Sequence, residues 1–324
     1  MEELFQLRKK SIYLPQLDLF VDAKKKQPFG FISHAHSDHI ARHDKIICTP
    51  ETARILSLRL KNPTFEILSF FRKKKMGNSS ITLFPAGHIL GSAQLYYESG
   101  GKSLLYTGDF RTGSSRTAES FIYQSCDILI METTFGNPNY VFPPRKKTEE
   151  ELLALIRQKL KEGIIPVVFV YPLGKAQEAL HLISHANIPV AAHHSILKYV
   201  SIYEQLGVKF ASFEQFKQGK TGDRVLLLPT VFRKNKIMEA IENKFTIYLS
   251  GWAMDAYAPY HFGVDKVVPY SDHADFQELL TFVQRVRPEI VYCTHGFNGF
   301  VGVLRENGFD ARLLDESEQM GLFY

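Results

Sequence analysis

The strongest chemical signal in the chain is a string of possible metal ligands that stand close together. The string reads HAHSDH, and its ligands are His34, His36, Asp38 and His39. It follows the short apolar segment Phe31–Ile32, so it stands where a strand is expected to end. Imidazole and carboxylate groups are ligands of zinc and of related borderline metals. The string is too specific for a chance polar turn, and it predicts a metal site.

Further acidic and histidine residues stand at the ends of other expected strands. They are Asp22, His88 in PAGHILGS, Asp109 in LYTGDF, and His295 in YCTHG. A fold can bring strand ends to one edge of its sheets, where a rigid scaffold aims the side chains that follow. Two cations held close together there would lower the pKa of a shared water and clamp the oxygens of a displacement reaction.

The expected elements alternate between strands and helices. Short strands are expected over residues 17–22, 30–33, 81–84, 94–98, 103–107, 128–132, 164–170, 290–294 and 312–314. Helices are expected behind two capping boxes, Thr148 with Glu151 and Asp275 with Glu278, and also from Gly174, from about His194 and from about Phe297. This alternation is typical of an α/β layered protein.

The composition limits the class of protein. Hydrophobic residues make up 45% of the 324 residues and charged residues 23%, which excludes a disordered chain. The net charge of +5 permits a polyanionic partner without requiring one. Cys48, Cys126 and Cys293 are scattered, which favours a reducing compartment and excludes a Cys-x-x-Cys zinc site. With neither a signal peptide nor a membrane-spanning stretch recognisable, we expect a cytoplasmic protein that does not contact a membrane.

With these motifs, the sequence resembles the metallo-β-lactamase superfamily along its whole length. The resemblance implies two divalent metal ions, zinc or alternatively manganese. It implies that His34, His36 and His88 hold the first ion, that Asp38, His39 and His295 hold the second, and that Asp109 bridges both. Asp22 would not be a ligand and would orient the histidine string.

A large insertion narrows the resemblance to the β-CASP nucleases, which cut phosphodiester bonds. Asp109 and His295 stand 186 positions apart, which leaves room for an inserted domain. IMETTFG around Glu132 and SDHAD around His273 resemble signature motifs of that group. The resemblance implies a four-layer αββα domain over residues 1–134 and 269–324 and an α/β β-CASP domain over residues 135–268.

The same resemblance implies a catalytic mechanism. A hydroxide bridging the metals would attack phosphorus, with Asp38 and Asp109 counted as catalytic ligands. His273 would protonate the departing sugar oxygen while Glu132 fixes the orientation of its ring.

The segments FVYPLGKAQ, SGW and YSDHAD resemble the bacterial and archaeal DNA-ligase-associated exonucleases most closely. That resemblance implies a DNA exonuclease in DNA repair, with a DNA ligase or a helicase as possible partners. His295 favours the alternative of an RNA-processing ribonuclease with the same site, because DNA-cutting eukaryotic members typically have valine there. DNA and RNA therefore both stay open as substrates.

Gly174 and Lys175 open a helix after a strand, where free N–H groups and a lysine could hold a substrate phosphate. Each basic run, such as Lys24–Lys26, is more often a solvated face than a nucleic-acid contact.

A non-catalytic nucleic-acid-binding subunit is disfavoured by the intact ligand set. A small-molecule hydrolase is disfavoured by the insertion and by Glu132 with His273.

Overall fold

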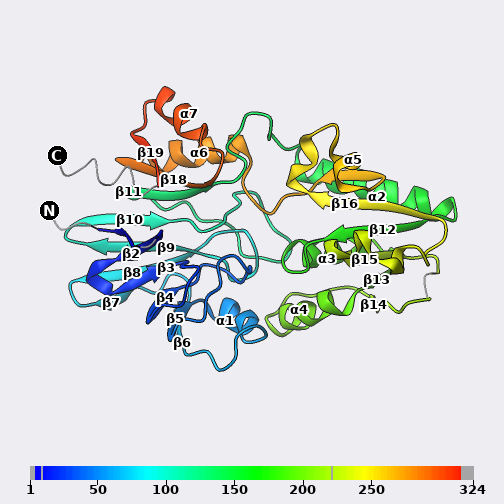
Figure 1. Ribbon diagram of the computed structural model, residues 1–324, viewed down its shortest axis with the longest axis horizontal. Coiled ribbons are helices and arrows are strands. Elements are labelled where there is room, and N and C mark those ends of the chain that lie inside the picture. The colour runs from blue at the N-terminus through cyan, green and yellow to red at the C-terminus, as the bar shows by residue number, and fades with distance from the viewer. Residues whose placement is uncertain (1–3, 9, 220–221, 315–324) are drawn as a thin grey trace. The chain divides into compact units, whose positions relative to one another are not determined.

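The computed structural model describes residues 4–8, 10–219 and 222–314, which form two compact units (Figure 1). Unit 1 comprises residues 1–138 and 273–324, and unit 2 comprises residues 139–272. Unit 1 is therefore discontinuous in sequence.

The first sheet of unit 1, sheet A, is built from the N-terminal segments (Figure 1). Its strands, in spatial order, are β1 (Gln6–Arg8), β2 (Ser11–Leu14), β3 (Leu19–Val21), β4 (Phe29–Phe31), β5 (Lys45–Cys48) and β6 (Phe65–Ile67). β1, β2 and β3 pair antiparallel, and β3 to β6 pair parallel. The 3-10 turn η1 (Pro15–Leu17) joins β2 to β3, and helix α1 (Pro50–Leu56) follows β5 and contacts β6.

The second sheet of unit 1, sheet B, joins the two ends of the sequence. Its strands, in spatial order, are β19 (Ala311–Leu313), β18 (Ile290–Gly296), β11 (Ile128–Thr133), β10 (Lys102–Tyr106), β9 (Ala93–Ser99), β8 (Ser79–Pro85) and β7 (Lys74–Met76). β18 lies parallel to β11, with Ile290 opposite Ile128. The C-terminal segment is thus part of the same sheet as the N-terminal third.

The alternation of side chains along sheet B divides unit 1 into layers. Leu104, Ile130 and Tyr292 belong to the apolar core that sheet B shares with sheet A. Their neighbours Leu105 and Met131 face the opposite way, into a core shared with α6 (Phe276–Val286) and α7 (Phe300–Glu306). Successive strand residues point to opposite faces, so sheet B is covered on both sides.

Helix α6 begins as the sequence predicts. The Asp275 carboxylate accepts a hydrogen bond from the Glu278 backbone N–H at 2.8 Å, and the Glu278 carboxylate accepts one from the Asp275 N–H at 3.1 Å. This reciprocal capping box satisfies two N–H groups that the first turn leaves without helical partners. The helix ends at Val286, just before Arg287 in the left-handed conformation and Pro288.

Unit 2 is an α/β layer built on a parallel sheet, sheet C. Its strands, in spatial order, are β14 (Glu214–Gln215), β13 (Val190–Ala192), β15 (Val225–Pro229), β12 (Ile165–Val170), β16 (Lys244–Ser250) and β17 (Lys266–Pro269). Its helices are α2 (Arg145–Lys161), α3 (Lys175–His185), α4 (His194–Gln205) and α5 (Ala258–Phe262), with the 3-10 turns η2 (Thr230–Lys234), η3 (Lys236–Met238) and η4 (Gly251–Met254). Val168 and Leu227 pack against α2, α3 and α4, whereas Val167 and Leu226 face a second core.

The predicted capping box at Thr148 is wrong. Helix α2 begins three residues earlier, at Arg145, and the Thr148 N–H already donates to the Pro144 carbonyl at 3.2 Å. Glu151 lies 3.9 Å from the Lys147 ammonium, its neighbour one turn back. Pro144 directly precedes the helix, and no side chain caps its first turn.

The predicted mixed α/β fold class is confirmed, with two stacked sheets and covering helices in unit 1 and an inserted α/β unit 2. Within the described ranges, no helix combines the length and the apolar composition needed to cross a membrane.

Candidate active site

Four of the predicted ligands gather in unit 1 where strands end. They are His34 after β4, His36, His88 after β8 and Asp109 after β10. All four are buried, and one ligand atom from each lies within 4.8 Å of the others. Three imidazoles and one carboxylate are a donor set that suits zinc.

One nitrogen atom inside this group has no hydrogen-bond partner among the described residues. His34 Nε2 is buried and makes no hydrogen bond with any described residue, and Asp109 Oδ2 lies 3.5 Å from it. Burial, and then the neighbouring His39, hold the pKa of His34 well below its ordinary value, which keeps its imidazole neutral. A buried polar atom without a partner costs about 1–3 kcal/mol, and metal ligation would remove that cost. The residues therefore fit a metal ion.

Asp109 occupies the centre of the site. Its Oδ2 lies 3.5 Å from His39 Nε2, 3.9 Å from His88 Nε2 and 4.0 Å from His273 Nε2. Although burial opposes ionisation, His39 and then His273 hold the pKa of Asp109 well below its ordinary value. A central ionised carboxylate is what a bridging ligand requires.

Asp22 anchors the histidine string through a set of hydrogen bonds. Its Oδ1 accepts from the Ser33 backbone N–H at 2.8 Å, and its Oδ2 accepts from the Ser33 hydroxyl at 2.5 Å. The Tyr106 hydroxyl donates to the same Oδ2 at 2.9 Å, and His39 Nδ1 lies 2.9 Å from it. An acceptor beside Nδ1 favours a proton on that nitrogen and leaves Nε2 of His39 as the nitrogen that could bind a metal.

The same carboxylate acts on His34 through Ser33. The Ser33 hydroxyl donates its hydrogen bond to Asp22, so its oxygen can accept one from His34 Nδ1, which lies 3.0 Å away. That arrangement keeps the lone pair of His34 on Nε2, the atom that faces Asp109. Asp22 therefore sets the tautomers of two histidines without contacting the candidate metal position.

The second predicted ligand set is more open than the first. Asp38 has a side chain that is 68% exposed, and its Oδ2 lies 3.7 Å from His39 Nε2. The His295 ring is centred 6.0 Å from that of His39, on an exposed residue with φ of 56°. Burial opposes protonation of His39, yet Asp109 and Asp22 raise its pKa well above the ordinary value. The carboxylates thus favour positive charge here, which a divalent cation would supply in place of a proton.

Glu132 and His273 form a pair beside this group, although 141 positions separate them in sequence. His273 Nδ1 lies 2.9 Å from Glu132 Oε1 and 3.2 Å from Oε2. The buried Glu132 side chain also accepts from the Phe110 N–H at 2.9 Å and from the Thr134 hydroxyl. The carboxylate is therefore held rigidly, and it directs Nε2 of His273 toward Asp109.

Gly174 and Lys175 lie in unit 2, at the start of α3. The Gly174 N–H donates to the Gln177 side chain at 2.7 Å, and the Lys175 ammonium forms an ion pair with Asp272. Their predicted contact with a substrate phosphate stays a prediction, and it would require Lys175 to leave Asp272.

Sequence reasoning did not find the residues that hold these groups in place. Ser33 and Tyr106 bind Asp22, and Thr134 binds Glu132. The only sequence signal for Ser33 is its position directly before the histidine string, and for Thr134 its position two residues after Glu132.

One family model matches a segment of the chain that contains two of the candidate site residues. Residues 259–299, which include His273 and His295, match the family described as the Zn-dependent metallo-hydrolase RNA specificity domain. A crystal structure titled as a protein of unknown function from Enterococcus faecalis V583 has the same fold, with a TM-score of 0.60 and 18% identity. The likeness covers 89% of this chain and 79% of that one.

Several curated proteins are similar in sequence. A probable DNA ligase of Opitutus terrae is 39% identical over 96% of this chain and 31% of its own length. An RNase J-like protein of Methanocaldococcus jannaschii is 30% identical over 53% of this chain and 48% of its own. The 5' exonuclease Apollo of Gallus gallus is 28% identical over 80% of this chain and 56% of its own. The chain thus spans about a third to just over half of these relatives.

Proposed function

We propose that this chain, which belongs to the β-CASP nuclease group of the metallo-β-lactamase superfamily, is a metal-dependent phosphodiesterase that acts on nucleic acid. The observation that carries the proposal is the Glu132–His273 pair, whose Nε2 lies 4.0 Å from Asp109 within the candidate metal group. A residue that can donate or accept a proton and a metal site close to it can act on opposite sides of one scissile bond.

The residues proposed to hold metal fall into two sets. His34, His36 and His88 would bind one ion, Asp38, His39 and His295 a second, and Asp109 would bridge them. Divalent metals bound here would lower the pKa of water and act as Lewis acids toward a phosphate. A site of imidazoles and carboxylates suits zinc, with manganese as the alternative.

The protein's own groups would manage the proton and the geometry. Glu132 accepts a hydrogen bond from Nδ1–H of His273 and orients the ring, so that Nε2–H of its imidazolium form could be donated to the departing sugar oxygen. The negative charge of Glu132 also stabilises the imidazolium form needed for that donation. Asp22 holds His39 directly and His34 through Ser33, so both rings would meet the metals with Nε2.

DNA is the substrate that we favour, in an exonuclease that serves DNA repair. The support is the 39% identity to a probable DNA ligase over nearly the whole chain and the likeness to the 5' exonuclease Apollo. A DNA ligase or helicase would be a partner in that setting. Free, buried cysteines suit a reducing compartment, and we place the protein in the cytoplasm.

An RNA-processing ribonuclease is the second candidate function. His295 stands where an RNA-cutting member has histidine, and the matched family is described by RNA specificity. The same site chemistry would serve both substrates, because each reaction displaces a sugar oxygen from phosphorus.

One assay tests these functions together. Single-stranded DNA and RNA of matched sequence, each labelled at either end, are incubated with the protein and added zinc or manganese. We expect a ladder from DNA that Asp109→Asn and His273→Ala abolish, and the label that shortens first gives the direction. Cutting of RNA alone would establish the ribonuclease. No cutting of either by protein that binds metal would overturn the nuclease proposal.

A further inference from the structure

A cavity of about 410 Å³ lies in unit 1 directly beside the second ligand set. Its wall includes Asp38, His39 and His295 together with the lysines Lys10, Lys24 and Lys25. This volume lies within the range of about 300–1,000 Å³ that is usual for ligand sites.

Strand register explains why residues distant in sequence meet at this cavity. Ile12 of β2 pairs with Val21 of β3, so the turn that carries Lys10 lies next to the loop after β3. Lys24 and Lys25 stand in that loop, two and three residues beyond Asp22. Val21 in turn pairs with Phe31 of β4, three residues before His34. The lysines therefore converge because sheet A aligns the ends of its strands.

Two of these lysines form no ion pair within the part of the chain that the structure describes. Among residues 4–8, 10–219 and 222–314, no carboxylate forms an ion pair with Lys24 or Lys25, whereas the adjacent Lys26 is paired with Asp44. The acidic residues in the same wall are already engaged. Asp22 accepts bonds from Ser33, Tyr106 and His39, and Asp38 lies 3.7 Å from His39.

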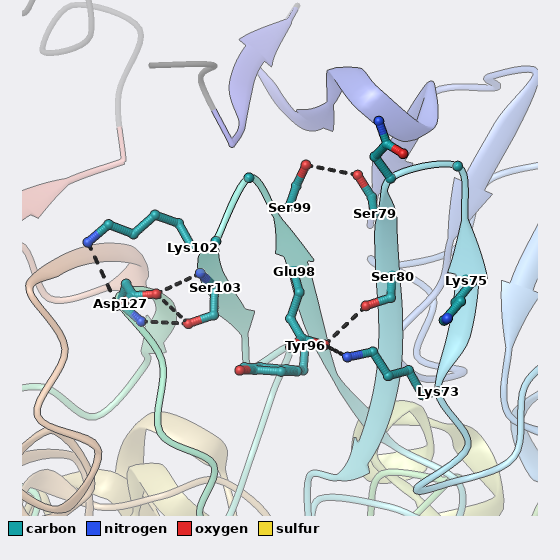
Figure 2. Close-up of a pocket in the computed structure, with 14 residues that line it drawn as sticks. Lys73, Lys75, Ser79, Ser80, Tyr96, Glu98, Ser99, Lys102, Ser103 and Asp127 are labelled. Atoms are coloured by element: carbon teal, nitrogen blue, oxygen red, sulfur yellow. Dashed lines mark hydrogen bonds and ion pairs between the residues drawn. The ribbon is translucent and has the colours of Figure 1, made fainter.

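A second lysine-rich cavity of unit 1 gives a useful contrast (Figure 2). There, Lys73 lies 2.6 Å from Glu98, which also accepts from Ser80. Asp127 lies 3.9 Å from Lys102 and accepts from Ser103. Two of the three lysines in that wall, Lys73 and Lys102, are thus paired with carboxylates of the same wall, and the cavity lies at the strand ends opposite to His88 and Asp109.

We propose that the cavity beside His39 and His295 binds the nucleotide next to the scissile bond of a single-stranded substrate, with Lys24 and Lys25 neutralising its phosphates. This inference rests on the proposed nuclease function. Uncompensated ammonium groups attract phosphate and release its counterions on binding. Apolar side chains of Leu7, Ile12, Val21 and Leu314 complete the wall and offer a surface for the sugar and base.

The test compares two double variants of equal charge. Lys24→Ala/Lys25→Ala removes the two cavity lysines, and Lys26→Ala/Lys61→Ala removes two exposed lysines outside the cavity wall. Binding of a fluorescent single strand with phosphorothioate linkages is measured by anisotropy over a series of salt concentrations, with metal content checked in parallel. A third variant, Lys24→Arg/Lys25→Arg, keeps the charge.

We expect the cavity variant to bind on the order of tenfold more weakly at low salt. The slope of log K against log salt should flatten by about 1.4, because each single-strand phosphate contact contributes about 0.7. The Lys26/Lys61 control should keep the wild-type slope, and the arginine variant should restore binding. If wild type cleaves but the cavity variant matches the control, the inference is wrong and the nuclease stands. If wild type neither binds nor cleaves, the proposed function itself is wrong.

Discussion

Asp22 Oδ2 lies 2.9 Å from His39 Nδ1, and this one carboxylate orders much of the histidine string. It reaches His34 through Ser33, and it also receives the Tyr106 hydroxyl. Two candidate ligands of different metals thus share one positioning residue. A change at Asp22 is therefore expected to act on both metal positions together.

Replacing Asp22 with asparagine should weaken metal binding about 10–100-fold. An amide can present an N–H to Nδ1 of His39 and would then favour the tautomer that protonates Nε2. A chelator-competition titration, with metal content determined independently, measures the effect. The matched control is Asp18→Asn, which alters an aspartate that binds Tyr13 instead. Equal metal affinity in the two variants would contradict the role given to Asp22.

Glu132→Gln and His273→Ala should each slow turnover about 10²–10⁴-fold while metal content stays near wild type. Glutamine keeps the shape of the side chain but cannot stabilise a charged His273 ring. Single-turnover cleavage rates and metal analysis of the same preparations separate the two effects. Loss of metal in parallel with loss of activity would show that the pair supports the ligands rather than the proton transfer.

Gly296→Ala should destabilise the protein by about 1–3 kcal/mol. Gly296 follows His295 with φ of 87°, and an added Cβ would lie 2.0 Å from the Thr133 carbonyl oxygen. Thermal or urea unfolding measures the change. Gly302→Ala is the comparison, because this helical glycine of α7 has open space around it. It should stabilise by about 0.5–1 kcal/mol, and destabilisation of similar size in both would refute the steric argument.

The three cysteines should be inert to alkylation in the folded protein. Burial raises the pKa of Cys48, Cys126 and Cys293 to about 12, so few thiolates form at pH 8. Iodoacetamide labelling followed by intact mass should show no adduct until denaturant is added. Rapid labelling of native protein would show that at least one thiol is accessible.

Glu66→Gln should cost stability at neutral pH and almost none in acid. Burial raises the pKa of Glu66, but hydrogen bonds from Lys45 and Lys74 outweigh it and lower the pKa below 4.5. A carboxyl group whose pKa is lower in the folded protein than in the unfolded chain stabilises the fold at pH values above 4.5. This stabilisation is lost as the pH falls through the folded-state pKa. We expect a loss of up to about 1 kcal/mol at pH 7, measured by urea unfolding. A difference from wild type that persists at pH 3 would argue against this ionic contribution.

Much of the candidate site was predictable because its chemistry depends on residue types at strand ends. His34, His36, His88 and Asp109 do lie together, and Glu132 does contact His273. The contacts of Ser33 and Tyr106 were not predictable, because serine and tyrosine occur in many settings and only tertiary packing brings them to Asp22. Asp38 is placed by a turn after β4, and His295 lies near the end of β18 with a φ of 56°.

The fold was predictable where the sequence carries strong local signals. The capping box at Asp275 and the strong alternation of apolar residues locate α6 and the strands of sheet B. The short hairpin of β1 and β2 and the three-residue strands β6 and β7 carry too few residues for a recognisable period. At α2, Glu151 pairs with Lys147 one turn back and does not form the capping box that residues 148 and 151 suggest.

Strand β11, which carries Glu132, pairs in parallel with β18 from a much later part of the chain, so the two strands are synthesised at different times. Glu132 leaves the ribosome well before its partner His273, since 141 positions separate them. At about 5–20 residues per second, the delay amounts to about 7–28 seconds. His34, His36, His88 and Asp109 all precede this interval, so the nascent chain can assemble its first ligand group before the proposed proton donor exists. The order of translation thus leaves the proposed Glu132–His273 pair incomplete until unit 2 has been made.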